Sequence, residues 1–151
     1  MLYERVVEVS ERLNEKGDVV TELNEEEVRN SLIKAKSDGI NSVAIAFMHS
    51  YINPDHENKI EQIAKEENFN QISVSHKVSP LIKLVGRGDT TVVDAYLSPI
   101  LRRYVNQVSD ELKDTKSTQL MFMQSNGGLT DANLFQGKDA LLSGPAGGVV
   151  S

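Results

Sequence analysis

The sequence contains no cysteine and no tryptophan, and aromatic residues make up only 5% of its 151 residues. Without cysteine the chain cannot form disulfides, a thiolate nucleophile or a Cys-ligated zinc site. The longest apolar run, Val43–Met48, is far too short to cross a membrane. The first residues show no cationic segment followed by an apolar stretch. We therefore expect no secretory signal, no membrane partner and a cytoplasmic location.

A surplus of basic residues is also missing, since Lys and Arg total 16 against 22 Asp and Glu, a net charge of −6. The imbalance lies in residues 1–70, which carry 15 acidic and 8 basic residues, whereas residues 71–151 carry a net charge of +1. Nucleic-acid binding needs a basic face. The composition therefore argues against a nucleic-acid partner.

The chain is long enough for one domain with a real core, and 39% of its residues are hydrophobic. Asn24 is expected to cap a helix that has three glutamates in its first turn and ends at Gly39. A second helix is expected to begin at Pro54, as its first helical residue. The short apolar runs on either side of that helix predict two buried strands, Ser42–Met48 and Ile72–Ser75.

The second half predicts a helical stretch from about Thr90 to Leu112, which Pro99 either kinks or divides. A strand is expected at Gln119–Gln124, followed by a short helix capped by Thr130. A β-hairpin is expected within residues 4–22. Strands that alternate with helices predict an α/β layered fold with a substantially parallel sheet. We treat residues 1–151 as a single α/β unit, cut from a longer chain because Gly147–Ser151 ends without a polar tail.

Two glycine-bearing segments could bind a ligand. Ser125, Asn126, Gly127 and Gly128 follow a predicted strand, and ligands in open α/β sheets bind at the carboxyl ends of strands. An ordinary Asn-Gly turn explains the same residues and is the more common case. The other segment is Ser143-Gly144-Pro145-Ala146-Gly147-Gly148, which could open a helix and bind an anion. Close helix packing is at least as good an explanation, and the segment lacks the Lys-Ser/Thr ending of a P-loop.

Two further segments carry titratable side chains. His49, Asp55 and His56 could hold a metal or move a proton. The simpler interpretation is that Asp55 and Glu57 complement a helix dipole and that His56 lies on the surface, with no metal bound. Arg87 lies in Gly86–Gly88, a predicted loop, where it could bind an anionic substrate or contact a neighbouring domain, although a solvated arginine is the more common case. No catalytic triad or carboxylate pair can be argued from the spacing.

Taken in order, these segments resemble the amino-terminal half of the hydantoinase A / 5-oxoprolinase family, which includes acetone carboxylase subunits. The resemblance runs through Ala46–Tyr51, Asn53–Glu57, Ser75-His76 and Thr90–Tyr96. It ends on Met123–Leu129 and Leu141–Val149. The Gln-Ser-Asn-Gly-Gly and Ser-Gly-Pro-Ala-Gly-Gly pair is highly specific.

The resemblance implies a ribonuclease-H-like fold, similar to actin, sugar kinases and heat-shock chaperone ATPases, and incomplete in this chain. It implies an ATP- and Mg-dependent hydrolase that opens a cyclic amide, 5-oxoproline or a hydantoin, by phosphorylating the amide oxygen. The family's two phosphate loops do not occur in these 151 residues, so the chain alone is expected to be inactive. A hydantoinase B-like subunit or domain, and the rest of the same chain, are the implied partners.

By position, the resemblance places Ser125–Gly128, Ser143 and Gly144 beside the substrate or phosphate cleft. It places Pro145–Gly148 at the start of a connecting helix near the hinge. Two alternatives stay open. One is an acetone-carboxylase-like subunit, and the other is a non-catalytic interaction or regulatory module.

Overall fold

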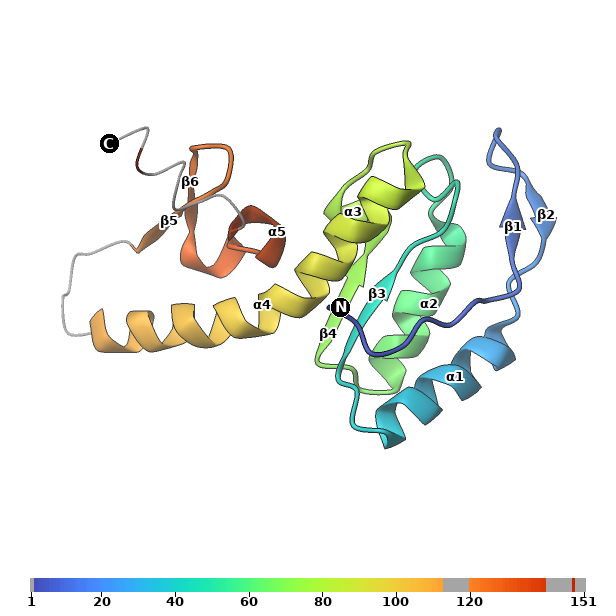
Figure 1. Ribbon diagram of the computed structural model, residues 1–151, viewed down its shortest axis with the longest axis horizontal. Coiled ribbons are helices and arrows are strands. Elements are labelled where there is room, and N and C mark those ends of the chain that lie inside the picture. The colour runs from blue at the N-terminus through green and yellow to red at the C-terminus, as the bar shows by residue number, and fades with distance from the viewer. Residues whose placement is uncertain (1, 113–119, 141–147, 149–151) are drawn as a thin grey trace. The chain divides into compact units, whose positions relative to one another are not determined.

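The computed structural model describes residues 2–112, 120–140 and 148 (Figure 1). The chain divides into two compact units, residues 1–95 and residues 96–151, which are described separately. None of the helices in the described ranges is long and apolar enough to cross a membrane.

The first unit begins with a small antiparallel hairpin of β1 (Arg12–Leu13) and β2 (Val19–Thr21). Its turn is built by Asn14, whose Oδ1 accepts from the backbone N–H groups of Lys16 and Asp18, each at 2.9 Å. Gly17 has a φ of +87°, a conformation that favours glycine. The strands are thus much shorter than the range 4–22, because residues 4–11 lie outside any strand.

Both predicted helices of this unit are present. In α1 (Glu25–Ser37), Asn24 Oδ1 accepts from the Glu27 N–H at 3.1 Å, which confirms the predicted cap. In α2 (Asp55–Glu66), Pro54 is the residue before the helix rather than its first residue. Asn53 Oδ1 takes up the N–H of Asp55 at 3.0 Å, so the helix begins one position later than predicted.

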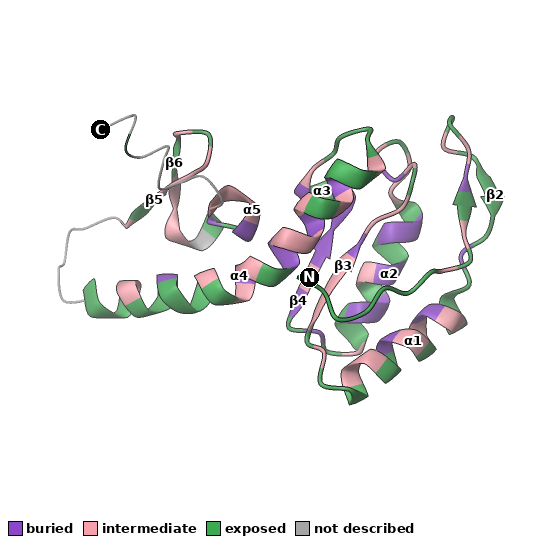
Figure 2. Ribbon diagram, viewed as in Figure 1, coloured by how far each residue is buried: buried purple, intermediate pink, exposed green. Residues whose placement is uncertain are grey.

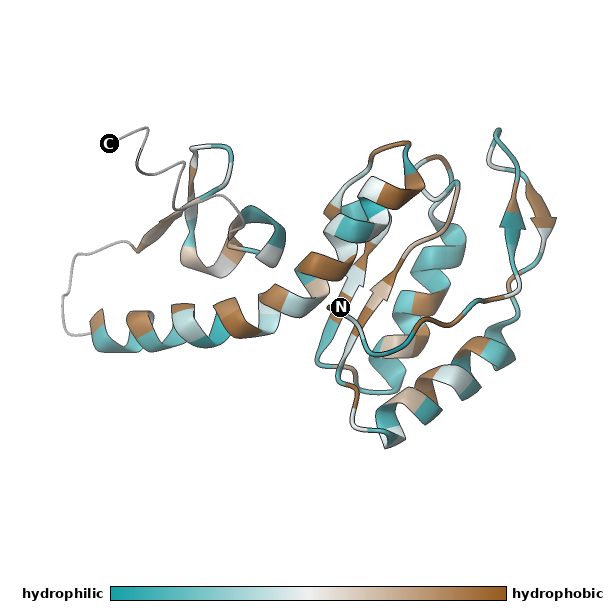
Figure 3. Ribbon diagram, in the orientation of Figure 1, coloured by the Kyte–Doolittle hydropathy of each residue, from teal (hydrophilic) through white to brown (hydrophobic). Residues whose placement is uncertain are grey.

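Strands β3 (Ser42–Ile45) and β4 (Gln71–Val74) pair in parallel, with α2 as the connection between them. Figure 1 shows the two strands side by side against α2. Figure 2 shows purple buried residues on α2 and β4, whereas β3 is mostly pink, because three of its four residues are half-buried. Figure 3 shows polar and apolar residues interspersed along α2, as expected for a helix with one buried face. The core that these elements form with α1 contains Leu23, Val28, Leu32, Ile45, Ile60, Ile63, Ala64, Phe69 and Val74.

Strand β3 ends at Ile45, before the predicted end at Met48. The reason lies in Phe47, whose backbone N–H donates to Glu57 and whose carbonyl accepts from Arg87. Side chains take the place of a neighbouring strand at that point, so the ladder stops. Within the described residues, β3 and β4 are the parallel pair and the other two sheets are antiparallel hairpins.

After the short helix α3 (Ser75–Val78), helix α4 (Leu84–Leu112) begins well before Thr90 and continues through Pro99. The prediction of a loop at Gly86–Gly88 was therefore wrong. The backbone N–H of Arg87 donates to Lys83 O at 3.0 Å, and the Arg87 guanidinium donates to the carbonyl of Leu81, just before the helix. These bonds outweigh the low helix propensity of the two glycines.

The second unit contains β5 (Met121–Met123), β6 (Leu129–Asp131), a 3₁₀ turn (Ala132–Leu134) and α5 (Gly137–Ala140). Strands β5 and β6 form an antiparallel hairpin in which Thr130 lies opposite Phe122. The prediction that Thr130 caps a helix was wrong, because its backbone belongs to a strand. The Phe122 and Phe135 rings stack at 5.1 Å, and Tyr104 meets Phe122 edge-on at 6.3 Å.

Candidate functional site

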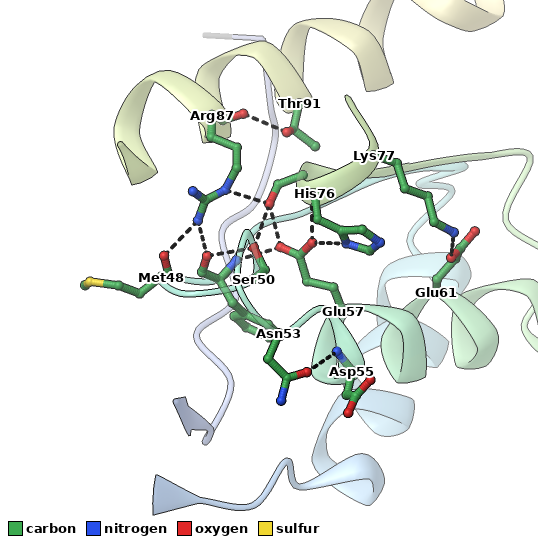
Figure 4. Close-up of polar contacts among 12 residues, drawn as sticks. Met48, Ser50, Asn53, Asp55, Glu57, Glu61, His76, Lys77, Arg87 and Thr91 are labelled. Atoms are coloured by element: carbon green, nitrogen blue, oxygen red, sulfur yellow. Dashed lines mark hydrogen bonds and ion pairs between the residues drawn. The ribbon is translucent and has the colours of Figure 1, made fainter. Parts of the chain in front are cut away.

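The most densely bonded polar cluster lies at the carboxyl ends of β3 and β4, in the first unit (Figure 4). At its centre is Glu57, in the first turn of α2, whose side chain is fully buried. One carboxylate oxygen accepts from Phe47 N at 2.9 Å and from Ser75 Oγ at 2.6 Å. The other accepts from His76 N at 3.1 Å and His76 Nδ1 at 2.6 Å. All four lone-pair positions of the carboxylate are therefore filled.

Arg87, on α4, is the fully buried positive charge of the same cluster. Its Nε donates to Ser75 Oγ at 2.9 Å, so this hydroxyl links the arginine to Glu57. Its guanidinium also lies 5.6 Å from the centre of the Tyr51 ring. A guanidinium has five N–H donors, and all five are used here. The remaining acceptors are the backbone carbonyls of Phe47, Met48, Leu81 and Ile82.

We call Glu57, Ser75, His76 and Arg87 the strand-end network. It joins the segment after β3, the start of α3 and the loop before α4. A buried charge is tolerated only when it is paired and hydrogen-bonded, and here each charged group has every bonding position occupied. Within this network, His76 Nε2 is the nitrogen without a bond to any described residue, on a side chain that is 14% exposed.

Both charges of this network were misjudged from the sequence. Arg87 was expected to be solvated, yet it is buried because five acceptors surround it. Glu57 was read as a partner of the helix dipole. Its spacing to Ile60 and Ala64 puts it on the apolar stripe of α2, and that position was the available signal for burial.

The histidine segment after β3 attaches the amino-terminal hairpin. His49 Nδ1 bonds Leu13 O at 2.8 Å, and Asn53 Nδ2 donates to Gly17 O at 2.9 Å. His56 Nδ1 bonds Glu11 Oε2 at 2.8 Å. His56 is buried rather than on the surface as expected, because the segment carrying Glu11 covers it, and its Nε2 has no partner.

The three weak metal candidates are His49, Asp55 and His56. Each histidine uses one ring nitrogen for the hairpin, and Asp55 is exposed in the first turn of α2. In the part of the chain that the structure describes, no group of three or more histidine, aspartate or glutamate side chains is placed to hold a metal ion.

An ion-paired surface adjoins the strand-end network. Lys77, next to His76, donates to Glu61 Oε2, and Lys65 Nζ lies 2.8 Å from Glu61 Oε1. Burial works toward a higher pKa for Glu61, but the hydrogen bonds from Lys65 and Lys77 outweigh it and lower the pKa. The positive charge of Lys77 is thus largely neutralised beside the imidazole of His76.

The Ser125–Gly128 segment forms the turn of the β5–β6 hairpin in the second unit. Gln124 N donates to Gly128 O at 2.8 Å, and Gly127 has a φ of +82°. Asn126 is exposed, and its Oδ1 accepts from Gly128 N at 2.8 Å. Ser125 Oγ donates to Asp139 O at 2.6 Å. The segment is thus bonded mainly to itself and to α5.

The other glycine segment lies almost wholly outside the described residues, which leave out Ser143, Gly144, Pro145, Ala146 and Gly147. Gly148 is described, and a Cβ built on it would meet nothing within 4 Å.

Comparisons with known proteins bear on the whole chain. Residues 1–68 match the family profile described as hydantoinase/oxoprolinase N-terminal region, and residues 87–151 match hydantoinase/oxoprolinase. The 5-oxoprolinase of Saccharomyces cerevisiae is 46% identical over 132 residues, which are 87% of this chain and 10% of that protein. The caprolactamase subunit alpha of Pseudomonas jessenii is 30% identical over 141 residues, 89% of this chain and 20% of that subunit.

Two solved structures resemble the chain. The crystal structure of ATP-dependent caprolactamase from Pseudomonas jessenii gives a TM-score of 0.85 at 29% identity, covering 91% of this chain and 20% of that chain. A nucleotide-free acetone carboxylase structure gives a TM-score of 0.82 at 25% identity, covering 93% of this chain and 21% of that chain. The chain spans about a tenth of the length of the 5-oxoprolinases it matches. The two family matches together cover most of the sequence, and relatives and solved structures agree with them: this chain belongs to the hydantoinase/oxoprolinase family.

Proposed function

We propose that this chain is part of an ATP-dependent hydrolase that opens a cyclic amide, either 5-oxoproline or a hydantoin. The observation that carries the proposal is the 46% identity to a 5-oxoprolinase over 87% of the chain. The likeness to an ATP-dependent caprolactamase supports the use of ATP on a ring amide. Phosphorylation of the amide oxygen by ATP would turn a poor electrophile into one that water attacks.

We further propose that the complete fold is ribonuclease-H-like and that the chain is one piece of its layered sheet. The parallel β3–α2–β4 unit is compatible with that fold. The described residues offer no cluster suited to Mg²⁺, so the metal and the nucleotide phosphates would be held by residues outside them. The likeness to a caprolactamase subunit alpha supports a hydantoinase B-like partner.

An assay of the full-length protein, with and without its partner subunit, tests the proposal. We expect ring opening of 5-oxoproline or hydantoin that requires ATP and releases ADP. The second candidate is an acetone-carboxylase-like subunit, which the TM-score of 0.82 favours. It predicts ATP use with acetone and bicarbonate and none with the ring amides. Absence of ATP use with every one of these substrates would instead favour a non-catalytic module.

A further inference from the structure

His76 lies at the start of α3, directly after β4, where the strand-end network reaches the surface. Its imidazole is held from one side only. Nδ1 is 2.6 Å from a Glu57 carboxylate oxygen, and the backbone N–H of His76 donates to the same oxygen at 3.1 Å. Figure 4 shows the imidazole ring directed at Glu57 through one edge. Two bonds from one residue to one carboxylate oxygen fix both the backbone and the ring.

The bonding of Glu57 determines which ring nitrogen carries the proton. Three of its four acceptor positions receive an N–H or O–H donor, from Phe47 N, Ser75 Oγ and His76 N. A carboxylate stabilised by these three donors has no proton to give, so Nδ1 is the donor of the fourth contact. In neutral imidazole the other nitrogen is then an acceptor with a free lone pair. Nε2 is that atom, and no hydrogen bond to a described residue involves it.

The charges around the ring also suit a group that gains a proton. Glu57 faces it directly and is fully buried. Arg87 is one step removed, because it meets Glu57 through Ser75 Oγ. Lys77 on the same helix is bonded to Glu61. A positive charge forming on the ring would therefore meet a carboxylate at 2.6 Å.

We propose that His76 is a general base of the amide-opening reaction, with Glu57 as the residue that orients it. As the oxygen of the attacking water bonds to the carbon of the O-phosphorylated amide, one water proton moves to Nε2. The amide nitrogen of the substrate takes up that proton when the carbon–nitrogen bond breaks, so His76 returns to its neutral form. The remaining hydroxyl proton goes to solvent and leaves an acyl phosphate, which a second water cleaves to the carboxylate and inorganic phosphate. Nδ1–H stays in place throughout, and Glu57 remains a carboxylate that stabilises the imidazolium.

This proposal rests on the proposed amidase function, and a pair of substitutions tests it in the full-length enzyme. In His76→Asn, the side-chain amide nitrogen stands in the position of Nδ1 and keeps the bond to Glu57, but nothing replaces Nε2. In His76→Gln, the amide reaches the position of Nε2, but the bond to Glu57 is lost. Lys59→Gln is the control, because Lys59 is exposed on α2, lies two residues after Glu57 and has its ammonium 3.4 Å from Glu25, outside the strand-end network.

We expect H76N to lower kcat on the order of 100-fold, with the KM for the amide and the melting temperature unchanged. H76Q should lower kcat similarly and also lower the melting temperature, whereas K59Q should leave kcat unchanged. Activity of H76N within about twofold of wild type would overturn the role of His76 and leave the amidase function standing. A wild-type protein that opens none of the ring amides would overturn both.

Discussion

The strand-end network of the first unit and the Gln124–Gly128 turn of the second both follow a strand and both hold several polar side chains. They differ in the partners with which their polar groups form hydrogen bonds. The network is buried, joins three separate segments and satisfies a positive and a negative charge completely. The turn is largely exposed, and most of its bonds close within five residues. A polar segment after a strand can therefore form either a buried network that joins distant segments or a turn bonded mainly to itself.

The difference shows where sequence motifs mislead. Ser125–Gly128 attracts notice because glycines next to Ser and Asn suit a ligand, yet the same residues suit a hairpin turn. Glu57 and Arg87 attract little notice, because single charged residues are usually solvated. Their importance comes from partners distant in the chain. Phe47 bonds both of them, from 10 residues before Glu57 and 40 residues before Arg87.

The largest expected effect is that of Arg87→Met, which removes all five donors at once. Glu57 would keep a buried negative charge without its positive counterpart, and four carbonyls would lose their partners. Arg87 and Glu57 meet through Ser75 rather than directly, so the main cost is that of buried groups left without hydrogen bonds, about 1–3 kcal/mol for each and about 3–5 kcal/mol in all. We expect that loss in the free energy of unfolding, measured by chemical denaturation.

Arg103→Met is the matched control, since Arg103 lies on the same helix and is exposed. It should change stability by no more than about 0.5 kcal/mol. Equal effects of the two substitutions would contradict the network as the feature that stabilises the first unit.

The same elements show which parts of the fold could be predicted from the sequence. Helix α1 was predictable because its signals are local: Asn24 caps it and three glutamates fill its first turn. The start of α4 was not, because two glycines in its first turns read as a loop. What holds that turn is a set of bonds from Arg87 to carbonyls of segments distant in sequence. Local helix propensity cannot predict a hydrogen bond between residues 40 positions apart.

The candidate site divides in the same way. The sequence placed polar residues after both strands, and β3 and β4 do pair in parallel there. The stripe with Ile60 and Ala64 signals that Glu57 turns inward, but the sequence could not show which donors meet it there or that the segment carrying Glu11 covers His56. Both facts depend on which segments meet in the fold.

Asn126→Ala tests whether the second unit's turn does more than reverse the chain. The change removes the acceptor of Gly128 N and the contact to substrate or phosphate that the family resemblance implies for this segment. We expect turnover of the full-length enzyme to fall about fivefold, the effect of one hydrogen bond of about 1 kcal/mol, without unfolding.

Asn126→Asp is the informative companion, because it keeps an oxygen for the Gly128 N–H. If the turn contacts a phosphate, the added negative charge should reduce turnover further. Unchanged kinetics in both variants would leave Ser125–Gly128 as a turn alone, and the comparison with the strand-end network would become one of function as well as of burial.

Gly127→Ala addresses the same turn through its backbone. Gly127 has a φ of +82°, where a side chain with a Cβ costs about 1–2 kcal/mol. We expect the second unit to lose about 1 kcal/mol of stability, seen as faster hydrogen exchange at β5 and β6. Gly127→Asn should cost less, because asparagine tolerates this conformation. Equal losses would show that something other than φ limits this position.

The smallest expected effect concerns the exposed ion pairs of the first unit. Hydrogen bonds from Arg29 and Gln62 lower the pKa of Glu66, and those from Lys65 and Lys77 lower that of Glu61 despite its partial burial. A carboxyl whose pKa is lower in the folded state stabilises the fold above its ordinary value, here 4.5. That contribution is lost as the pH falls through the lowered value.

We expect Glu61→Gln to reduce this acid-dependent loss of stability by a few tenths of a kcal/mol, about the contribution of one surface ion pair. Stability measured between pH 7 and pH 3 should therefore fall slightly less steeply in the variant, and Glu26→Gln, at an exposed position, should retain the wild-type slope. An unchanged slope for Glu61→Gln would contradict a contribution of this ion pair to the acid sensitivity of the fold.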